Sequence, residues 1–236
     1  SIGSSILIAA TDEQYLETAK SEAAELAAVY WGVRKDFHFT VPTGTIDETI
    51  GMAQACDEKP VFISDSGDNV TSGAAGDVPV FLERLIALDT QDVVLAGIQD
   101  PAAVEKCRAA GVGEKVQLEI GGKLDTINGR PLSVGGAVVR LTDGGAVVRI
   151  GGVDVILTSR RTSFTTIDGF IAFGIDPRQR SVIVVKLGYL FPELKAAAAK
   201  SFVAMSSGFA SQKLDLPYKH IPRPIFPLDS GMTWGP

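Results

Sequence analysis

Residues 61–110 of this 236-residue chain repeat one pattern, in which a short apolar run is followed by a helical periodicity, and this repetition constrains the fold most strongly. The runs Val61–Ile63 and Asp92–Ile98 are typical of buried strands, and the helical patterns follow at Val78–Leu88 and Pro101–Ala110. Connections this short favour right-handed parallel crossovers. We therefore expect an α/β fold, a largely parallel sheet with flanking helices.

Further elements are predicted on both sides of this region. Upstream we expect a buried strand at Ser5–Ala10, a helix capped by Thr11 or Asp12 that runs to about Phe37, a short strand at Phe39–Val41, and a helix at Ile46–Ala55 opened by a Thr45/Glu48 capping box. Downstream, the sequence predicts a helix at Ile167–Phe173, a strand at Ser181–Lys186, a helix at Pro192–Phe202, and a proline-rich tail from Leu214 that is anchored on the surface by Tyr218, Ile225 and Phe226.

Four strand patterns lie between these two groups of elements, at Lys115–Ile120, Leu132–Leu141, Ala146–Ile150 and Val153–Thr158. Glycine pairs separate them, and glycine supplies the positive φ angles that tight hairpins need. The spacing predicts an antiparallel β-meander at about residues 115–158, joined to the parallel sheet.

Charge and composition exclude several classes of partner. The net charge of −6 disfavours nucleic acid and anionic membrane surfaces as partners. The first residues carry no basic segment, and their apolar run is too short for a signal peptide or a membrane span. We expect a cytoplasmic protein that binds neither nucleic acid nor membrane.

The loop after the strand at residues 61–63 concentrates polar side chains at the place where open α/β sheets bind ligands. It carries Asp65, Asp68, Asn69, Gly73 and Asp77, but neither a phosphate-loop lysine nor the ligand alternation of an EF-hand. Two interpretations stay open. The loop positions a polar or cationic group or supports a metal held from elsewhere, or else Asp77 caps the next helix while Asp68 and Asn69 satisfy a tight turn.

Two other strand ends carry candidate site residues. Ser159, Arg160 and Arg161 follow the last meander strand, and either arginine could hold a substrate carboxylate or pair with Asp65 or Asp68. Lys186 ends another strand, where a lysine either faces a site or marks the return of the chain to solvent.

Histidine is scarce, and this limits the metal chemistry that the chain can supply. The two histidines, His38 and His220, share no motif, whereas a catalytic zinc site takes three protein ligands. Both are expected at the surface or in packing roles. A serine-based triad is poorly supported, although Ser159 and Ser206 lie near strand ends.

Five stretches in the same order and spacing resemble the C-terminal domain of the microcystinase MlrC family, whose members are regarded as zinc metallopeptidases. They are SDSGDNVTSGAAGD, GVGEKVQLEIGGKLD, GGVDVILTSRRTS, GIDPRQRSVIVVKLGYLFPEL and LPYKHIPRPIFPLD. The resemblance covers about Val61 to Asp229. It implies that residues 1–58 are the end of an N-terminal domain and that residues 59–236 form the C-terminal α/β domain.

The resemblance also implies a function. Such an enzyme hydrolyses small peptide or amide substrates at a zinc-bound water, and the zinc ligands belong mainly to an N-terminal metal-binding domain, upstream of Ser1. This chain alone would then bind no zinc. By the same analogy Asp65–Asp77 and the TSRRT stretch face the cleft, where Asp65, Asp68 and Asn69 would orient substrate or the metal's surroundings, with Gly73, Asp77, Ser159, Arg160, Arg161 and Lys186 nearby.

Two departures from the family pattern leave the substrate open. Many members carry a proline and a glycine run where this chain has Val70–Gly73, and a histidine and an arginine where it has Gly188–Phe191. A different class of function also stays open: a non-catalytic binding or assembly module, including a homo-oligomer, that uses the proline-rich tail and the edges of the meander.

Overall fold

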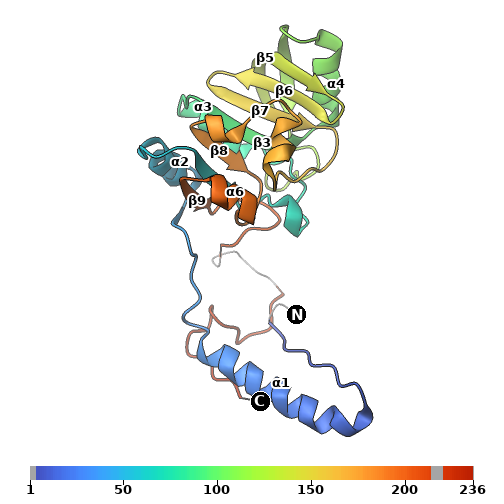
Figure 1. Cartoon of the computed structure of the whole chain (residues 1–236), viewed down its shortest axis with the longest axis vertical. Helices are drawn as coiled ribbons and strands as arrows, with labels where there is room; N and C mark the ends of the chain where they lie inside the picture. Colours follow the sequence, from blue (N-terminus) through green and yellow to red (C-terminus); the bar gives the residue numbers. More distant parts are fainter. Residues whose placement is uncertain (1–3, 214–219, 236) are drawn as a thin grey trace. The chain divides into compact units, whose positions relative to one another are not determined.

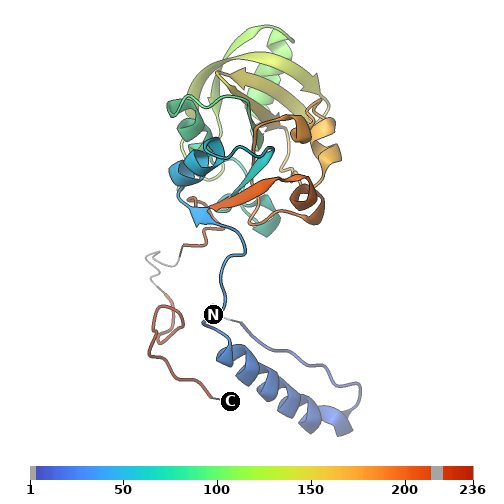
Figure 2. The same cartoon turned by 60° about the vertical axis from the view of Figure 1, so that its left-hand side comes forward.

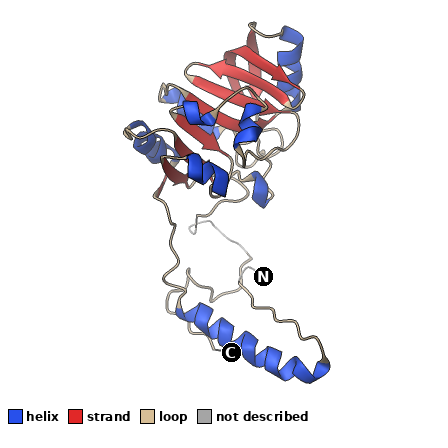
Figure 3. Cartoon of the chain, in the orientation of Figure 1, coloured by secondary structure: helices blue, strands red, loops and turns tan. Residues whose placement is uncertain are grey.

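A computed structural model describes residues 4–213 and 220–235, and the chain divides into two compact units. One unit comprises residues 1–40 with 213–236, and the other comprises residues 41–212. Figure 1 follows the chain by colour, and Figure 3 distinguishes its helices from its strands. The two units are described separately.

The described part of the larger unit is built on a nine-stranded sheet of order β1-β9-β2-β8-β3-β7-β6-β5-β4 (Figure 1). From β1 to β7 along this order neighbours pair in parallel, and β7, β6, β5 and β4 pair antiparallel. The predicted α/β fold with a largely parallel sheet and an antiparallel meander is therefore confirmed. In chain order the strands are β1 Thr43–Gly44, β2 Val61–Asp65, β3 Val93–Gln99, β4 Lys115–Ile120, β5 Leu132–Thr142, β6 Gly145–Ile150, β7 Val153–Thr158, β8 Val182–Val185 and β9 Lys200–Ala204.

Helices cover both faces of the sheet, because residues of the central strands alternate between two apolar clusters. In β2, Val61 and Ile63 join one cluster while Phe62 joins the other. The first cluster includes side chains of α2 (Ile46–Gln54), α3 (Val80–Ala87) and α4 (Pro101–Ala110). The second includes side chains of α5 (Ile167–Ile171) and α6 (Pro192–Ala197). Figure 2 shows this layered arrangement from a second side.

Local signals placed several elements correctly. The capping box of Thr45 and Glu48 opens α2 with both hydrogen bonds formed. Asp100 caps α4, Pro101 stands at its start, and the helix ends at Gly111. The strands β4 and β7 have the predicted bounds.

Three predictions of local structure are wrong. Ser5–Ala10 forms no strand and is largely exposed, and residues 39–41 are not a strand either, since β1 lies at Thr43–Gly44. The predicted helix 192–202 stops at Ala197. Ala199 N donates to Pro60 O, and the chain continues as β9 beside β2, so tertiary pairing overrides the helix propensity of the alanine run.

The smaller unit contains one described α-helix, α1 (Leu16–Gly32), preceded by the 3₁₀ turn η1 (Glu13–Tyr15). Asp12 caps this turn by accepting from Gln14 N, so the predicted cap is confirmed. Trp31 packs against Phe226 and Trp234, with ring centroids 6.2 and 5.8 Å away. The predicted anchor Phe226 therefore has a partner, whereas Tyr218 and the start of the tail lie outside the described residues.

A cavity of about 1050 Å³ lies within the smaller unit, lined largely by aromatic and proline side chains together with Arg34. The Arg34 guanidinium lies 4.0 Å from the Trp31 ring centroid. None of the described helices combines the length and the apolar character needed to span a membrane.

Candidate functional site

The predicted site residues lie in loops at one edge of the sheet. Because β9, β2, β8, β3 and β7 run in parallel, their carboxyl ends meet at the same edge. The loops that follow them carry Asp65–Asp77, Ser159–Arg161, Lys186–Phe191 and Met205–Gln212. This edge is where open α/β sheets bind ligands.

Lys186 forms the centre of a buried ion cluster at this edge. Its Nζ donates to Asp65 Oδ2 at 3.0 Å, to Asp68 Oδ2 at 2.8 Å and to the carbonyl oxygen of Val78 at 2.8 Å. Lys186 and Asp65 are 2% exposed and Asp68 is fully buried. The lysine therefore does not return the chain to solvent, and its three ammonium protons are all engaged.

The remaining oxygen atoms of the cluster are also satisfied. Ser206 Oγ donates to Asp65 Oδ1 and accepts from Gly67 N at 2.8 Å. Asp68 accepts from Gly76 N and Val78 N, both at 2.8 Å. These bonds tie the ends of β2, β8 and β9 to the Asp65–Asp77 loop. Neither carboxylate can bind a ligand without giving up a buried hydrogen bond.

Burial shifts the protonation equilibria of this cluster. Burial raises the pKa of the Asp68 carboxyl, and Lys186 opposes that rise. Burial alone would lower the pKa of Lys186, but the Asp65 and Asp68 carboxylates outweigh it and raise the pKa of this lysine above its ordinary value. Lys186 is thus held as an ammonium ion, and it serves as a positive anchor rather than as a base.

Asp77 does not cap the helix that follows it, so that prediction is wrong. The N-cap of α3 is Pro79, which makes no side-chain cap bond. The Asp77 carboxylate instead accepts from the backbone N–H groups of Lys123, Leu124 and Asp125 at 2.8, 2.6 and 3.1 Å. It therefore fastens the loop after β4 to the start of α3.

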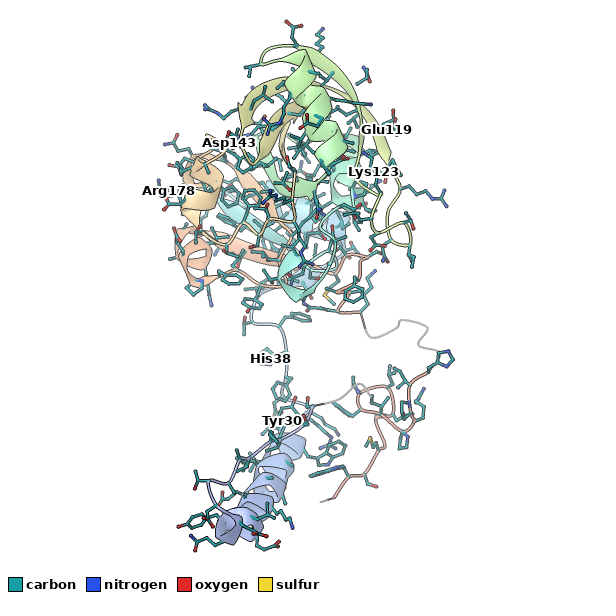
Figure 4. All side chains as sticks on the ribbon, turned by 90° about the vertical axis from the view of Figure 1, so that its right-hand side faces the viewer. Tyr30, His38, Glu119, Lys123, Asp143 and Arg178 are labelled. Carbon is teal, nitrogen blue, oxygen red and sulfur yellow. The ribbon has the colours of Figure 1, made fainter. Side chains whose placement is uncertain are left out.

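Lys123 reinforces the same attachment. Its Nζ donates to Asp100 Oδ2 and to the carbonyl oxygen of Glu119, both at 2.5 Å, and Figure 4 labels Glu119 and Lys123 close together. Asp100 Oδ2 also accepts from Gly121 N. The loop after β4 is thus held by two buried carboxylates.

Asn69 occupies the turn that sequence reasoning assigned to it. Its Oδ1 accepts from Thr71 N at 2.9 Å and from Thr71 Oγ1 at 2.7 Å, which caps the 3₁₀ turn η2 (Val70–Ser72). Gly73 ends this turn with φ of 96°, a conformation that glycine adopts readily. Among the described residues, Asn69 Nδ2 has no hydrogen-bond partner, so this N–H donor is not used by the turn.

Arg160 and Arg161 are exposed, unlike the buried acids Asp65 and Asp68. Neither forms an ion pair with a described residue, and Lys186 takes the place of an arginine beside Asp65 and Asp68. Their pairing with these acids, one of the two predicted alternatives, is therefore wrong. Ser159 is partly buried, and its N–H donates to the carbonyl oxygen of Gly144. Both guanidinium groups remain available to a ligand.

The residues described here do not fit a zinc ion. His38 and His220 are exposed, as expected, and His38 Nδ1 contacts the carbonyl oxygen of Asp36 (His38 is labelled in Figure 4). Within residues 4–213 and 220–235, no group of three or more His, Cys, Asp and Glu side chains could hold a metal ion. A zinc site of the usual kind would need ligands from outside this set.

Sequence reasoning missed the roles of Ser206, Gly188 and Gln212. Ser206 follows β9 and Asp65 is the last residue of β2, but β9 itself was not predicted, so the pairing of these two residues had no signal. Gly188 and Gln212 meet beside Asn69, and only the tertiary structure brings them there.

Comparisons with known proteins agree with the fold and the order of these loops. Residues 63–220 match the family described as MlrC C-terminus. The chain is 29% identical over 199 residues to Microcystinase C of a Sphingomonas species, which covers 78% of this chain and 39% of that protein.

A crystal structure described as a "putative metallopeptidase" from Mesorhizobium sp. BNC1 has the same fold, with a TM-score of 0.74 at 20% identity. The match covers 92% of this chain and 47% of that one, so the chain spans less than half the length of both relatives. The family match extends over most of the sequence and includes every loop of the candidate site up to Gln212. The chain therefore belongs to the MlrC family, and it contains that family's C-terminal region.

Proposed function

We propose that this chain is the C-terminal part of a longer hydrolase of peptide or amide bonds, in which it forms the substrate-facing wall. The family match and the name of the curated relative, Microcystinase C, support this proposal. The observation that carries it is the sheet edge itself, where a hydrogen-bonded loop presents Asn69 and where Arg160 and Arg161 form no ion pair with any described residue.

The residues of the edge divide into two roles. Asp65, Asp68 and Lys186 are positioning residues, because they are buried and hold the loop that carries Asn69. Arg160 and Arg161 are exposed and would bind a substrate carboxylate through paired N–H donors. The support of Asn69 is thus fixed by buried hydrogen bonds, which would lower the entropy cost of a productive substrate geometry.

Zinc remains part of this proposal, with its ligands in a preceding domain of the same polypeptide. The metal would supply an activated water to the reaction. The part of this chain that the structure describes contributes no cluster of metal ligands, so its own contribution is binding and orientation.

Hydrolysis of a quenched-fluorescent linear peptide tests the proposed function. We expect a longer polypeptide that contains this chain, supplied with zinc, to cleave the peptide and to lose the activity on treatment with a chelator. The 236-residue chain alone should be inactive. Equal activity of the chain alone, or no cleavage of any peptide in a broad panel by the longer polypeptide, would overturn the proposal.

An assembly role is the second candidate, and the smaller unit gives it one specific observation. Helix α1 has no buried residue, and apolar side chains such as Leu26 and Val29 are 49% and 65% exposed. Exposed apolar surface of this kind marks contact sites. Sedimentation velocity measures self-association directly, and a monomer at high protein concentration would exclude the homo-oligomer.

A further inference from the structure

In the Asn69 side-chain amide, the oxygen is hydrogen-bonded to Thr71, and the nitrogen has no partner among the described residues. Its Oδ1 is fixed by Thr71, and this bond determines which end of the amide is oxygen and which is nitrogen. Asn69 is only 6% exposed, yet Nδ2 donates to no residue in the described part of the chain. In the described part of the chain, Arg34 Nε is the one fully enclosed side-chain nitrogen or oxygen that lacks a partner. Asn69 Nδ2 also lacks a partner there but is not fully enclosed, so it remains open to solvent.

The side-chain amide of Gln212 lies near that of Asn69, beside Gly188. A Cβ atom built on Gly188 would lie 2.9 Å from Asn69 Nδ2 and 3.2 Å from Gln212 Nε2. Any side chain at position 188 would therefore crowd both amides. The glycine leaves them uncovered, and its backbone does not require a positive φ angle. Gln212 also makes no side-chain hydrogen bond with a described residue.

Exposed aromatic side chains lie on the two segments that carry Gly188 and Gln212. Tyr189 follows Gly188, is 65% exposed and stacks on Phe191 with the ring planes 11° apart. Phe209 is 75% exposed, and its ring lies 3.8 Å from the position of a Cβ on Gly73. Amide donors beside exposed rings match the chemistry of a peptide, which offers a carbonyl oxygen next to an apolar side chain.

The charge behind the amides favours a neutral acceptor. Two carboxylates and one ammonium ion give the cluster of Asp65, Asp68 and Lys186 a formal charge of −1 in its ionised form. An anionic ligand at Asn69 would be repelled by this charge, whereas an uncharged carbonyl oxygen would not.

We propose that Asn69, Gln212 and Gly188 form a subsite that binds a neutral carbonyl oxygen of a peptide-like ligand, with Tyr189 and Phe209 contacting the adjacent apolar group. Its assignment to the substrate rests on the proposed function. Capture of a carbonyl oxygen does not depend on hydrolysis or on metal, so it can be measured on this chain by itself.

Nuclear magnetic resonance titration of the 236-residue chain with N-acetyl-phenylalanine amide tests the subsite. The wild-type chain should give a saturable shift of the Asn69 side-chain amide signal, with a dissociation constant of order 1–10 mM for so small a probe. Acetate, an anion with the same acceptor atom type, should bind at least several-fold more weakly. No saturable shift, or tighter binding of acetate, would overturn the proposal.

Matched variants separate the Nδ2 donor of Asn69 from the Oδ1 acceptor that caps the turn. Asn69→Asp keeps an oxygen for Thr71 N but removes the N–H donor, and Gly188→Ala places a methyl group against both amides. Each should weaken binding of the probe about tenfold or more, Asn69→Asp by loss of the hydrogen bond and Gly188→Ala by obstruction of both amides. Gly51→Ala, with no atom within 4 Å of the new methyl, should leave it unchanged. Unaltered affinity in Asn69→Asp contradicts the subsite.

The two proposals can fail separately. If the probe binds as expected but the longer polypeptide hydrolyses no peptide, the proposed function is wrong and the carbonyl subsite stands. If the longer polypeptide is active while the probe fails to bind and Asn69→Asp leaves kcat/KM unchanged, the subsite is wrong and the hydrolase stands.

Discussion

The buried ammonium group of Lys186 holds the Asp65–Asp77 loop through ion pairs with both Asp65 and Asp68. We expect Lys186→Met to lower the free energy of unfolding by about 3–5 kcal/mol, because it leaves two buried carboxylates without their cation. Lys195→Met, a change at an exposed lysine, should stay within about 0.5 kcal/mol. Urea unfolding is best followed by far-UV circular dichroism, since both tryptophans, Trp31 and Trp234, lie in the smaller unit.

A loss below about 1 kcal/mol in Lys186→Met would mean that the cluster relaxes or admits water, and that it does not hold the loop rigidly.

The exposed arginines give a prediction about substrate choice. In the longer polypeptide, Arg160→Ala together with Arg161→Ala should lower kcat/KM about tenfold or more for a peptide with a free C-terminal carboxylate, since a charged hydrogen-bonded pair is lost. For the same peptide with a C-terminal amide the change should be small. Equal losses on both peptides would show that the arginines act on the fold and not on a carboxylate.

Asp154 gives a prediction about pH. Burial alone would raise its pKa, but hydrogen bonds from Arg149 and Arg180 hold the pKa of Asp154 below the ordinary value of 3.8. Between the folded and the unfolded pKa the unfolded chain binds more protons. Asp154 therefore stabilises the fold above about pH 4, and this stability is lost as the pH falls through the lower folded value.

Asp154→Asn should consequently be less stable than the parent at pH 7 by about 1–2 kcal/mol, and it should lose less stability on acidification. Asp143→Asn, at an exposed hairpin position, should follow the parent at every pH. Parallel acid profiles for Asp154→Asn and the parent, measured by thermal melting from pH 7 to pH 3, would contradict the assignment.

At the scale of elements, the backbones of two loops meet at Gly67. A Cβ there would lie 2.4 Å from the carbonyl oxygen of Ser206, whereas one on Gly51 in α2 would meet nothing within 4 Å. Gly67→Ala should therefore destabilise the larger unit by about 1–3 kcal/mol through strain at the end of β9. Gly51→Ala should stabilise it by about 0.5–1 kcal/mol, because alanine has a higher helix propensity than glycine and lowers the conformational entropy of the unfolded chain.

Unfolding midpoints in urea compare the two glycine variants directly. Opposite signs are expected, and a neutral Gly67→Ala would mean that the contact between the two loops is loose.

The elements that sequence reasoning located well have capping or helix-ending residues at their ends. The helix α4 has Asp100, Pro101 and Gly111 at its ends, and these residues act locally. The strand β9 has no such signal, because it follows an alanine run and is specified by hydrogen bonds to β1 and β2. Pairing with a strand that is distant in the sequence is not encoded in a local pattern.

In the candidate site, too, local positions could be predicted from the sequence, whereas contacts between distant residues could not. Sequence position alone placed Lys186 at a strand end and Asp65 and Asp68 in the loop after a strand; in the structure Lys186 follows β8, Asp65 ends β2 and Asp68 lies in the loop after it. Their mutual pairing, and the separation of Arg160 and Arg161 from them, depend on which strands are neighbours. The order β9-β2-β8 brings Ser206, Asp65 and Lys186 together, and only the sheet topology provides this information.

At the scale of the whole molecule, the described part of the chain contains a nine-stranded sheet and a smaller unit that includes α1. The assignment of residues 1–58 to the end of a preceding domain remains a prediction. The lengths of the two relatives, of which this chain covers 39% and 47%, are consistent with a polypeptide that carries further structure. The division of labour that we propose is orientation of the substrate by this chain and metal binding elsewhere in the longer polypeptide.

Metal content tests this division of labour most directly. The 236-residue chain and a longer polypeptide that contains it would both be purified without chelator and examined by elemental analysis and zinc titration. The account predicts far less than one zinc per molecule for the chain alone and at least one for the longer polypeptide. Stoichiometric, tightly bound zinc in the chain alone would contradict the account and would show that its own residues build the metal site.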